Sequence, residues 1–136
     1  MKTLLLDTHL LLWAAGAPDR LSPRAVELLQ DPTRTLVFSA VSLWEIGVKA
    51  GLGRADFVVN GVQLRRGLLA HGYLELAMTG EHALELRHLP LLTGAGRPER
   101  RDPFDRMLVC QARSEGITLL TADAAMAAYG VPVMVV

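Results

Sequence analysis

The sequence has a single cysteine, no excess of either charge and no apolar run long enough to cross a membrane. Cys110 has no second cysteine to pair with and stands among apolar residues, so we predict a small buried side chain in a reducing compartment. Acidic and basic residues are equal, 14 of each, which excludes an overall basic field for nucleic acid. Asp7 and His9 interrupt the apolar start "MKTLLLDTHLLLW", so it is not expected to be a signal peptide, and we expect a cytoplasmic protein.

What is present is enough for one folded domain. The chain has 136 residues, of which 51% are hydrophobic, so it can bury a core but is too short for two domains. Basic charge is local rather than global, because Arg97, Arg100, Arg101 and Arg106 share one segment. The first three are candidates for phosphate contacts, and a solvated loop is the equal alternative.

Short apolar segments alternate with amphipathic ones along the whole chain. The expected strands cover residues 3–6, 35–40, 73–77, 116–123 and 131–136. The expected helices cover residues 10–15, 23–30, 41–50, 58–71, 79–89 and 124–129, with another that begins at 102–103. Strands that alternate with helices predict an α/β fold, with a parallel sheet covered on both faces.

Four carboxylates are expected at one edge of this sheet. Asp7 directly follows the first strand, and Asp123 ends the strand "GITLLTAD", so both lie at the carboxyl edge, where open parallel sheets bind ligands. Glu45 lies within the apolar helix "VSLWEIGVK", and Asp105 lies in the first turn of the helix that leads to the strand of Asp123. The four acids are therefore candidates for one site.

Each of these acids also has a purely structural explanation. Asp7 and Asp123 can cap the helices that follow them. Glu45 precedes Lys49 by four residues, the favourable order for an ion pair on a helix.

The two aspartates in "RRDPFDRM", Asp102 and Asp105, are expected to have different roles. Asp102 precedes Pro103, which suits the first helical position, so Asp102 is expected to cap the helix through the N–H groups of Phe104 or Asp105. Asp105, one turn further, is then free to face the strand ends.

Clustered carboxylates favour one kind of chemistry. They repel each other and raise each other's pKa unless a cation neutralises them. Oxygen ligands without a cysteine or histidine cluster suit Mg²⁺ or Mn²⁺ rather than zinc, and such ions serve phosphodiester hydrolysis. The sequence has no G-x-S-x-G motif for a serine nucleophile, and "GAG" at 94–96 is no phosphate-binding loop.

These motifs resemble those of PIN-domain ribonucleases, of the toxin type found in bacterial VapBC toxin–antitoxin pairs. The resemblance spans almost the whole chain through "LLLDTHLLLW", "SAVSLWEIGVKAGLG", "RDPFDRMLVCQA" and "ITLLTAD", of which the third is the most specific. Carried over by position, the catalytic and metal-binding acids are Asp7, Glu45, Asp105 and Asp123. Thr8, Ser42 and Thr121 flank matching positions and are expected to orient carboxylates or hold water, and Asp102 belongs to the third motif.

The resemblance implies a three-layer α/β/α fold, a homodimer and a cognate antitoxin that inhibits the enzyme. It implies an endoribonuclease whose Mg²⁺ or Mn²⁺ ion activates the attacking water, with Glu45 as a ligand or as the residue that positions this water. The alternatives are a non-catalytic module with the same fold and a metal-dependent nuclease acting on DNA. An aspartyl-phosphate phosphatase would need a second acid where this chain has His9. The histidines are not needed by this scheme, and Trp13 and Trp44 are expected to belong to the core.

Overall fold

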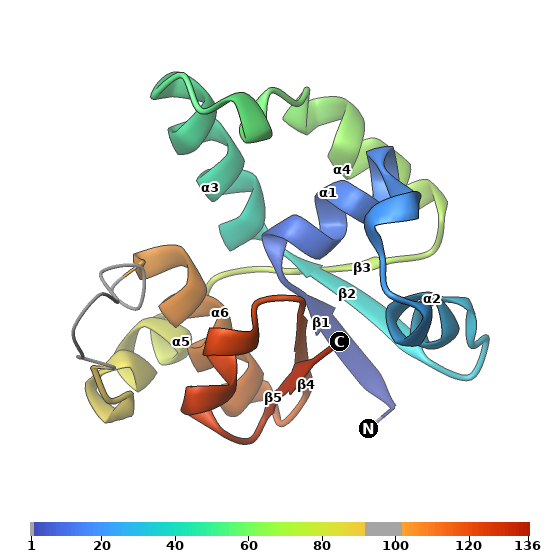
Figure 1. Ribbon diagram of the computed structural model, residues 1–136. Helices are drawn as coiled ribbons and strands as arrows, with labels where there is room; N and C mark the ends of the chain where they lie inside the picture. Colours follow the sequence, from blue (N-terminus) through green and yellow to red (C-terminus); the bar gives the residue numbers. More distant parts are fainter. Residues whose placement is uncertain (1, 92–101) are drawn as a thin grey trace.

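The computed structural model describes residues 2–91 and 102–136, and within them the chain forms a single parallel sheet flanked by helices (Figure 1). The sheet has five strands in the order β3-β2-β1-β4-β5. They are β1 (Thr3–Leu6), β2 (Thr35–Ser39), β3 (Leu74–Leu76), β4 (Thr118–Thr121) and β5 (Val133–Val135). The expected three-layer α/β/α fold is confirmed, because helices cover both faces of this sheet.

The helices connect successive strands. The α-helices are α1 (Thr8–Gly16), α2 (Pro23–Gln30), α3 (Ala40–Gly51), α4 (Gly61–Ala70), α5 (Gly80–Glu85) and α6 (Pro103–Glu115). Single turns of 3₁₀ helix are η1 (Pro18–Arg20), η2 (Ala55–Phe57) and η3 (Leu86–His88), and a longer one is η5 (Ala124–Tyr129). Helix starts follow the sequence closely: Ser22 caps α2, Thr79 caps α5 and Asp102 caps α6, as predicted.

Side chains of β1 alternate between two separate hydrophobic cores. Leu4 and Leu6 join the core under α1, α2, α3 and α4, whereas Leu5 joins the core under α6 and η5. This alternation follows from the two-residue repeat of a strand, and it requires apolar residues throughout because neither face meets water. Cys110 is fully buried in the second core, as predicted.

The winding of the chain reverses at β1. The chain passes from β1 to β2 and β3 on one side, then returns to place β4 and β5 on the other. Asp7 continues the pairing between β1 and β4, because its N–H donates to the carbonyl of Leu120 at 3.0 Å. The carboxyl edge of β1 and β4 is thus the place where this fold class binds ligands.

Several boundaries differ from the sequence prediction. Helix α4 begins at Gly61 rather than at residue 58, because Asn60 accepts a hydrogen bond from the N–H of Gln63 and caps it. Segment 79–89 is α-helical only to Glu85 and continues as η3, and residues 124–129 form a 3₁₀ helix. Strand β4 ends at Thr121, so Asp123 lies two residues beyond it.

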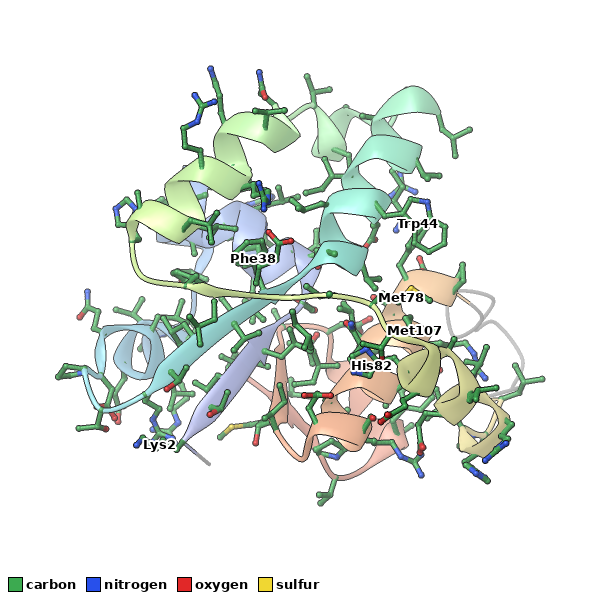
Figure 2. All side chains as sticks on the ribbon, turned by 180° about the vertical axis from the view of Figure 1, so that it is seen from behind. Lys2, Phe38, Trp44, Met78, His82 and Met107 are labelled. Carbon is green, nitrogen blue, oxygen red and sulfur yellow. The ribbon has the colours of Figure 1, made fainter. Side chains whose placement is uncertain are left out.

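Trp44 is not a core residue, contrary to the prediction. It is 53% exposed on α3, and its ring meets the edge of the Phe104 ring at a centroid distance of 4.7 Å (Figure 2). Trp13 is partly buried against the first core, closer to the expectation. Among the residues described, no helix is long and apolar enough to cross a membrane.

Candidate functional site

Asp7 lies at the end of β1 with both carboxylate oxygens bonded. The N–H of Leu10 donates to Oδ1 at 3.0 Å, and the hydroxyl of Thr121 donates to Oδ2 at 2.5 Å. The predicted cap is therefore present, but it uses only one oxygen. Burial raises the pKa of Asp7, and the bonds from Thr121 and Leu10 partly oppose this rise. The carboxylate is thus held in a fixed orientation at the sheet edge.

Glu45 is buried on α3, with 2% of its surface exposed. Its Oε1 accepts from the hydroxyl of Thr8 at 2.5 Å, and the Ser42 hydroxyl lies 2.9 Å from the same Thr8 oxygen. Because a threonine hydroxyl has one proton, Thr8 gives it to Glu45 and accepts from Ser42 in turn. Thr8 therefore orients Glu45 directly, and Ser42 acts on Glu45 only through its bond to Thr8.

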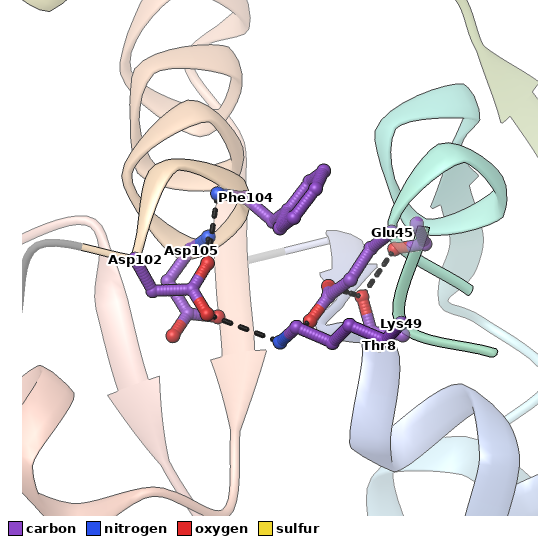
Figure 3. A network of polar contacts seen from close by, with 7 residues as sticks. Thr8, Glu45, Lys49, Asp102, Phe104 and Asp105 are labelled. Atoms are coloured by element: carbon purple, nitrogen blue, oxygen red, sulfur yellow. Dashed lines mark hydrogen bonds and ion pairs between the residues drawn. The ribbon is translucent and has the colours of Figure 1, made fainter. Parts of the chain in front are cut away.

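Lys49 lies between Glu45 and Asp102, one turn along α3 from Glu45 (Figure 3). Its Nζ is 2.5 Å from Glu45 Oε2 and 3.0 Å from Asp102 Oδ2. Burial disfavours the ammonium form, but the bonds to the two carboxylates raise the pKa of Lys49 above its usual value. The helical pair of Glu45 and Lys49 is present as predicted, while the long-range contact with Asp102 was not predicted, since no local pattern encodes it.

Asp102 and Asp105 have different environments, as the sequence predicted. Asp102 Oδ1 accepts from the N–H of Phe104 at 2.8 Å and from that of Asp105 at 3.3 Å, which is the cap. The carboxylate of Asp105 accepts no hydrogen bond from any residue within 2–91 and 102–136. Burial, followed by the charges of Asp102, Glu45 and Asp7, raises the pKa of Asp105 to about 8, against the opposing effect of Lys49.

Asp123 occupies a more exposed position on the same edge. Its carboxylate accepts from the N–H of Ala125 at 3.0 Å and caps η5. This is the helix cap that the sequence offered as the alternative to a role in the site. Its own N–H donates to the hydroxyl of Thr121 at 3.0 Å, and that hydroxyl donates to Asp7. Asp123 is thereby linked to Asp7 through Thr121, whereas Asp7, Glu45 and Asp105 are coupled directly by their charges.

The four arginines of the basic segment divide into two groups. Arg97, Arg100 and Arg101 lie outside the described residues. Arg106, which the sequence places in the same basic segment, is buried and donates to the carbonyls of Pro90 at 2.9 Å and Leu89 at 3.3 Å. Arg106 therefore anchors the chain before residue 92 and does not contribute a surface charge.

A divalent cation fits the chemistry of these residues. Asp105 offers a half-buried carboxylate without a donor in the described part of the chain, and its neighbours Asp7 and Glu45 carry further oxygen atoms of the kind that such a cation prefers. In that part of the chain, however, no three acidic, histidine or cysteine side chains are placed so that they converge on one ion. Glu45 is instead paired with Lys49, whose positive charge offsets part of the negative charge of the acids.

The sequence matches the family model of the PIN domain over residues 4–132. The chain belongs to the PIN domain family. This membership confirms the resemblance drawn from the sequence motifs, and no curated protein matches the chain.

Two solved structures are similar to this PIN domain. The first is the crystal structure of VapBC2 from Rickettsia felis bound to a DNA fragment from their promoter, with a TM-score of 0.62 and 15% identity over 98% of this chain and 97% of that one. The second is a domain of a functionally unknown protein from Methanocaldococcus jannaschii, with a TM-score of 0.58 and 18% identity over 100% of this chain and 91% of that one. At these identities the similarity establishes the fold.

Proposed function

We propose that this PIN domain is an endoribonuclease toxin of a type II toxin–antitoxin pair and hydrolyses RNA with Mg²⁺ or Mn²⁺. The single observation that carries the proposal is the carboxylate of Asp105, which is half-buried, lacks a donor among the described residues and lies near the charges of Asp102, Glu45 and Asp7. PIN domains are generally nucleases, and the similar VapBC2 structure supports the toxin assignment.

The residues divide the work as follows. Asp7 and Asp105 would hold the cation with Asp123, and Glu45 would complete the site as a ligand or by orienting the attacking water. When bound, the cation would activate this water and offset charge on the phosphoryl oxygens. Thr121 and Leu10 fix the direction of the Asp7 carboxylate, and Thr8 fixes that of Glu45, so the oxygens are oriented before any substrate arrives.

The test is cleavage of a structured RNA and a DNA of the same sequence by the purified chain. We expect RNA cleavage with Mg²⁺ or Mn²⁺, none in excess chelator, and a loss of several orders of magnitude for Asp105→Asn. Asp19→Asn, which changes an exposed acid outside the site, is the matched control. Undiminished activity of Asp105→Asn or in chelator contradicts the mechanism, while preferential cleavage of the DNA supports the alternative of a DNA nuclease.

An antitoxin partner is proposed for the groove between the end of α1 and α4. The groove has a volume of about 480 Å³, and it is lined mainly by apolar side chains together with Asn60, Gln63 and His71. An apolar antitoxin helix would suit it. Gly67 lines the groove and has open space at its Cβ position, so Gly67→Phe should fill it and weaken antitoxin binding. Gly80→Phe, outside the groove and with equally open space, should not.

A homodimer is proposed through an exposed apolar stripe that runs along α3 to its C-cap, Leu52. Trp44, Val48 and Leu52 follow each other at four-residue spacing and are 53%, 39% and 75% exposed. A stripe of this kind is typical of a protein interface. Light scattering should show a dimer that Leu52→Asp weakens, whereas Leu69→Asp on α4 leaves it intact. A monomeric wild-type chain at micromolar concentration contradicts the dimer.

A further inference from the structure

The carboxylates that contact Lys49 have no oxygen left without a hydrogen-bond donor. Glu45 uses Oε1 for Thr8 and Oε2 for Lys49. Asp102 uses Oδ1 for the N–H groups of Phe104 and Asp105, and Oδ2 for Lys49. Asp7 and Asp105 have no contact with the ammonium group. Lys49 therefore forms ion pairs with two of these four carboxylates, those of Glu45 and Asp102, and leaves the other two to different partners.

The position of Lys49 is fixed by more than its ion pairs. Its side chain is 13% exposed, and the ammonium nitrogen lies 4.9 Å from the ring centroid of Phe57 and 5.6 Å from that of Phe104. Both aromatic faces attract a cation and limit where the flexible lysine side chain can go. The ammonium group joins α3 to the start of α6, the two helices that supply Glu45 and Asp105 (Figure 3).

Lys49 disfavours a second divalent ion beside Glu45 and Asp102. Its ammonium nitrogen already lies 2.5 Å from a carboxylate oxygen of Glu45 and 3.0 Å from one of Asp102. A second divalent ion would have to displace Lys49 from Glu45 and Asp102, or lie beside its positive charge. Either arrangement is unfavourable, because close like charges in a partly buried site repel strongly.

We propose that Lys49 is a built-in cation that occupies the place of a second metal ion, so that this PIN domain binds one divalent ion per chain. The proposal rests on the proposed metal-dependent function and adds the number of ions and the residue that sets it. Lys49 is a positioning residue in this scheme: it holds Glu45 and Asp102 and contacts neither the ion nor the substrate.

The test counts Mn²⁺ ions bound to the purified full chain, by electron paramagnetic resonance of the free ion at constant pH and ionic strength. We expect one ion for the wild type and two for Lys49→Met, since the vacated carboxylates of Glu45 and Asp102 become ligands. Lys2 is the other lysine of the sequence and is exposed at the opposite end of β1 (Figure 2), so Lys2→Met is the matched control and should bind one ion.

Two more variants guard against a folding defect. Lys49→Gln keeps an amide donor for both carboxylates but has no charge, so it should also gain a second ion. Lys49→Arg keeps the charge and should bind one. Two ions bound to the wild type, or a single ion in folded Lys49→Met or Lys49→Gln, overturns the proposal. A wild type that binds no Mn²⁺ while it cleaves RNA refutes the proposed function itself, which is a different result.

Discussion

The hydroxyl of Thr121, at the end of β4, donates to the carboxylate of Asp7, at the end of β1, over a distance of 2.5 Å. These two neighbouring strands are thus connected at the edge of the sheet where the acids lie. The same hydroxyl accepts from the N–H of Asp123. Thr121 therefore orients one proposed ligand and fixes the backbone of another, although it carries no charge itself.

Replacing Thr121 with Val tests this connection. The substitution keeps the shape of the side chain but leaves Asp7 Oδ2 without its donor, and a bond to a charged group contributes about 1.5–3 kcal/mol. We expect Mn²⁺ affinity to fall by about tenfold or more. Thr118→Val, at the start of the same strand, is the control and should leave affinity unchanged. Equal effects in both variants would mean that the loss reflects the strand and not the bond.

The different roles of Asp102 and Asp105 predict opposite effects of substitution. Asp102→Ala removes the cap and a partner of Lys49, so it should lower the free energy of unfolding by at least about 1 kcal/mol. Asp105→Asn removes a repelled charge and should keep or raise stability in chelator while most of the activity is lost. Melting temperature and RNA cleavage measured on both variants decide the matter. If Asp102→Ala is as inactive as Asp105→Asn while folded, Asp102 also belongs to the site.

The raised pKa of Asp105 predicts a pH dependence with a definite sign. The folded state holds this proton up to a pH of about 8, whereas the unfolded chain loses it near 3.8. Between these values the folded state binds more protons, so the contribution of Asp105 to stability decreases as the pH rises. Denaturation of the metal-free protein should show this decline, and Asp105→Asn should lack it. A steeper decline in the variant than in the wild type contradicts the assignment.

Metal uptake should displace the same proton. Below pH 8 the cation competes with the proton on Asp105, so Mn²⁺ binding should release protons and strengthen as the pH rises. Calorimetric titrations in two buffers of different ionisation enthalpy measure the protons released. Identical binding heats in both buffers would show that Asp105 is already ionised before the metal arrives.

His82 is predicted to matter for stability and not for catalysis. It is 1% exposed: Nδ1 accepts from the N–H of Thr79, and Nε2 lies 2.9 Å from a carboxylate oxygen of Glu115. His82→Leu removes both of these contacts, and a typical hydrogen bond contributes about 0.5–1.5 kcal/mol to stability. Urea denaturation should show this loss, and the exposed His88→Leu should not. Activity per folded molecule should be unchanged by either substitution.

Local patterns predicted most of the fold and the edge at which the acids lie. The caps by Ser22, Thr79 and Asp102 are encoded within a few residues, and so is the position of Asp7 directly after an apolar strand. The family resemblance then selected the acids from among other capping residues. The family resemblance also implies that Asp123 is a metal ligand. This stays a prediction, since the structure shows Asp123 as an exposed cap of η5.

Contacts between segments that are distant in the sequence could not be predicted from local sequence patterns. Lys49 was correctly paired with Glu45 because a helix brings residues four apart together. Its contact with Asp102 depends on how α3 packs against α6, which no local rule specifies. The sequence also predicts a core position for Trp44, but Trp44 is 53% exposed on α3.

The bond between Thr121 and Asp7 joins residues 114 positions apart in the sequence. During synthesis, the strand that carries Asp7 leaves the ribosome long before the strand that carries Thr121, and β1 lacks its β4 neighbour throughout that interval. A nascent chain can therefore not complete the acid cluster until nearly all of this domain has emerged. For a protein proposed to cut RNA, we therefore expect the growing chain to be inactive until β4 has paired with β1.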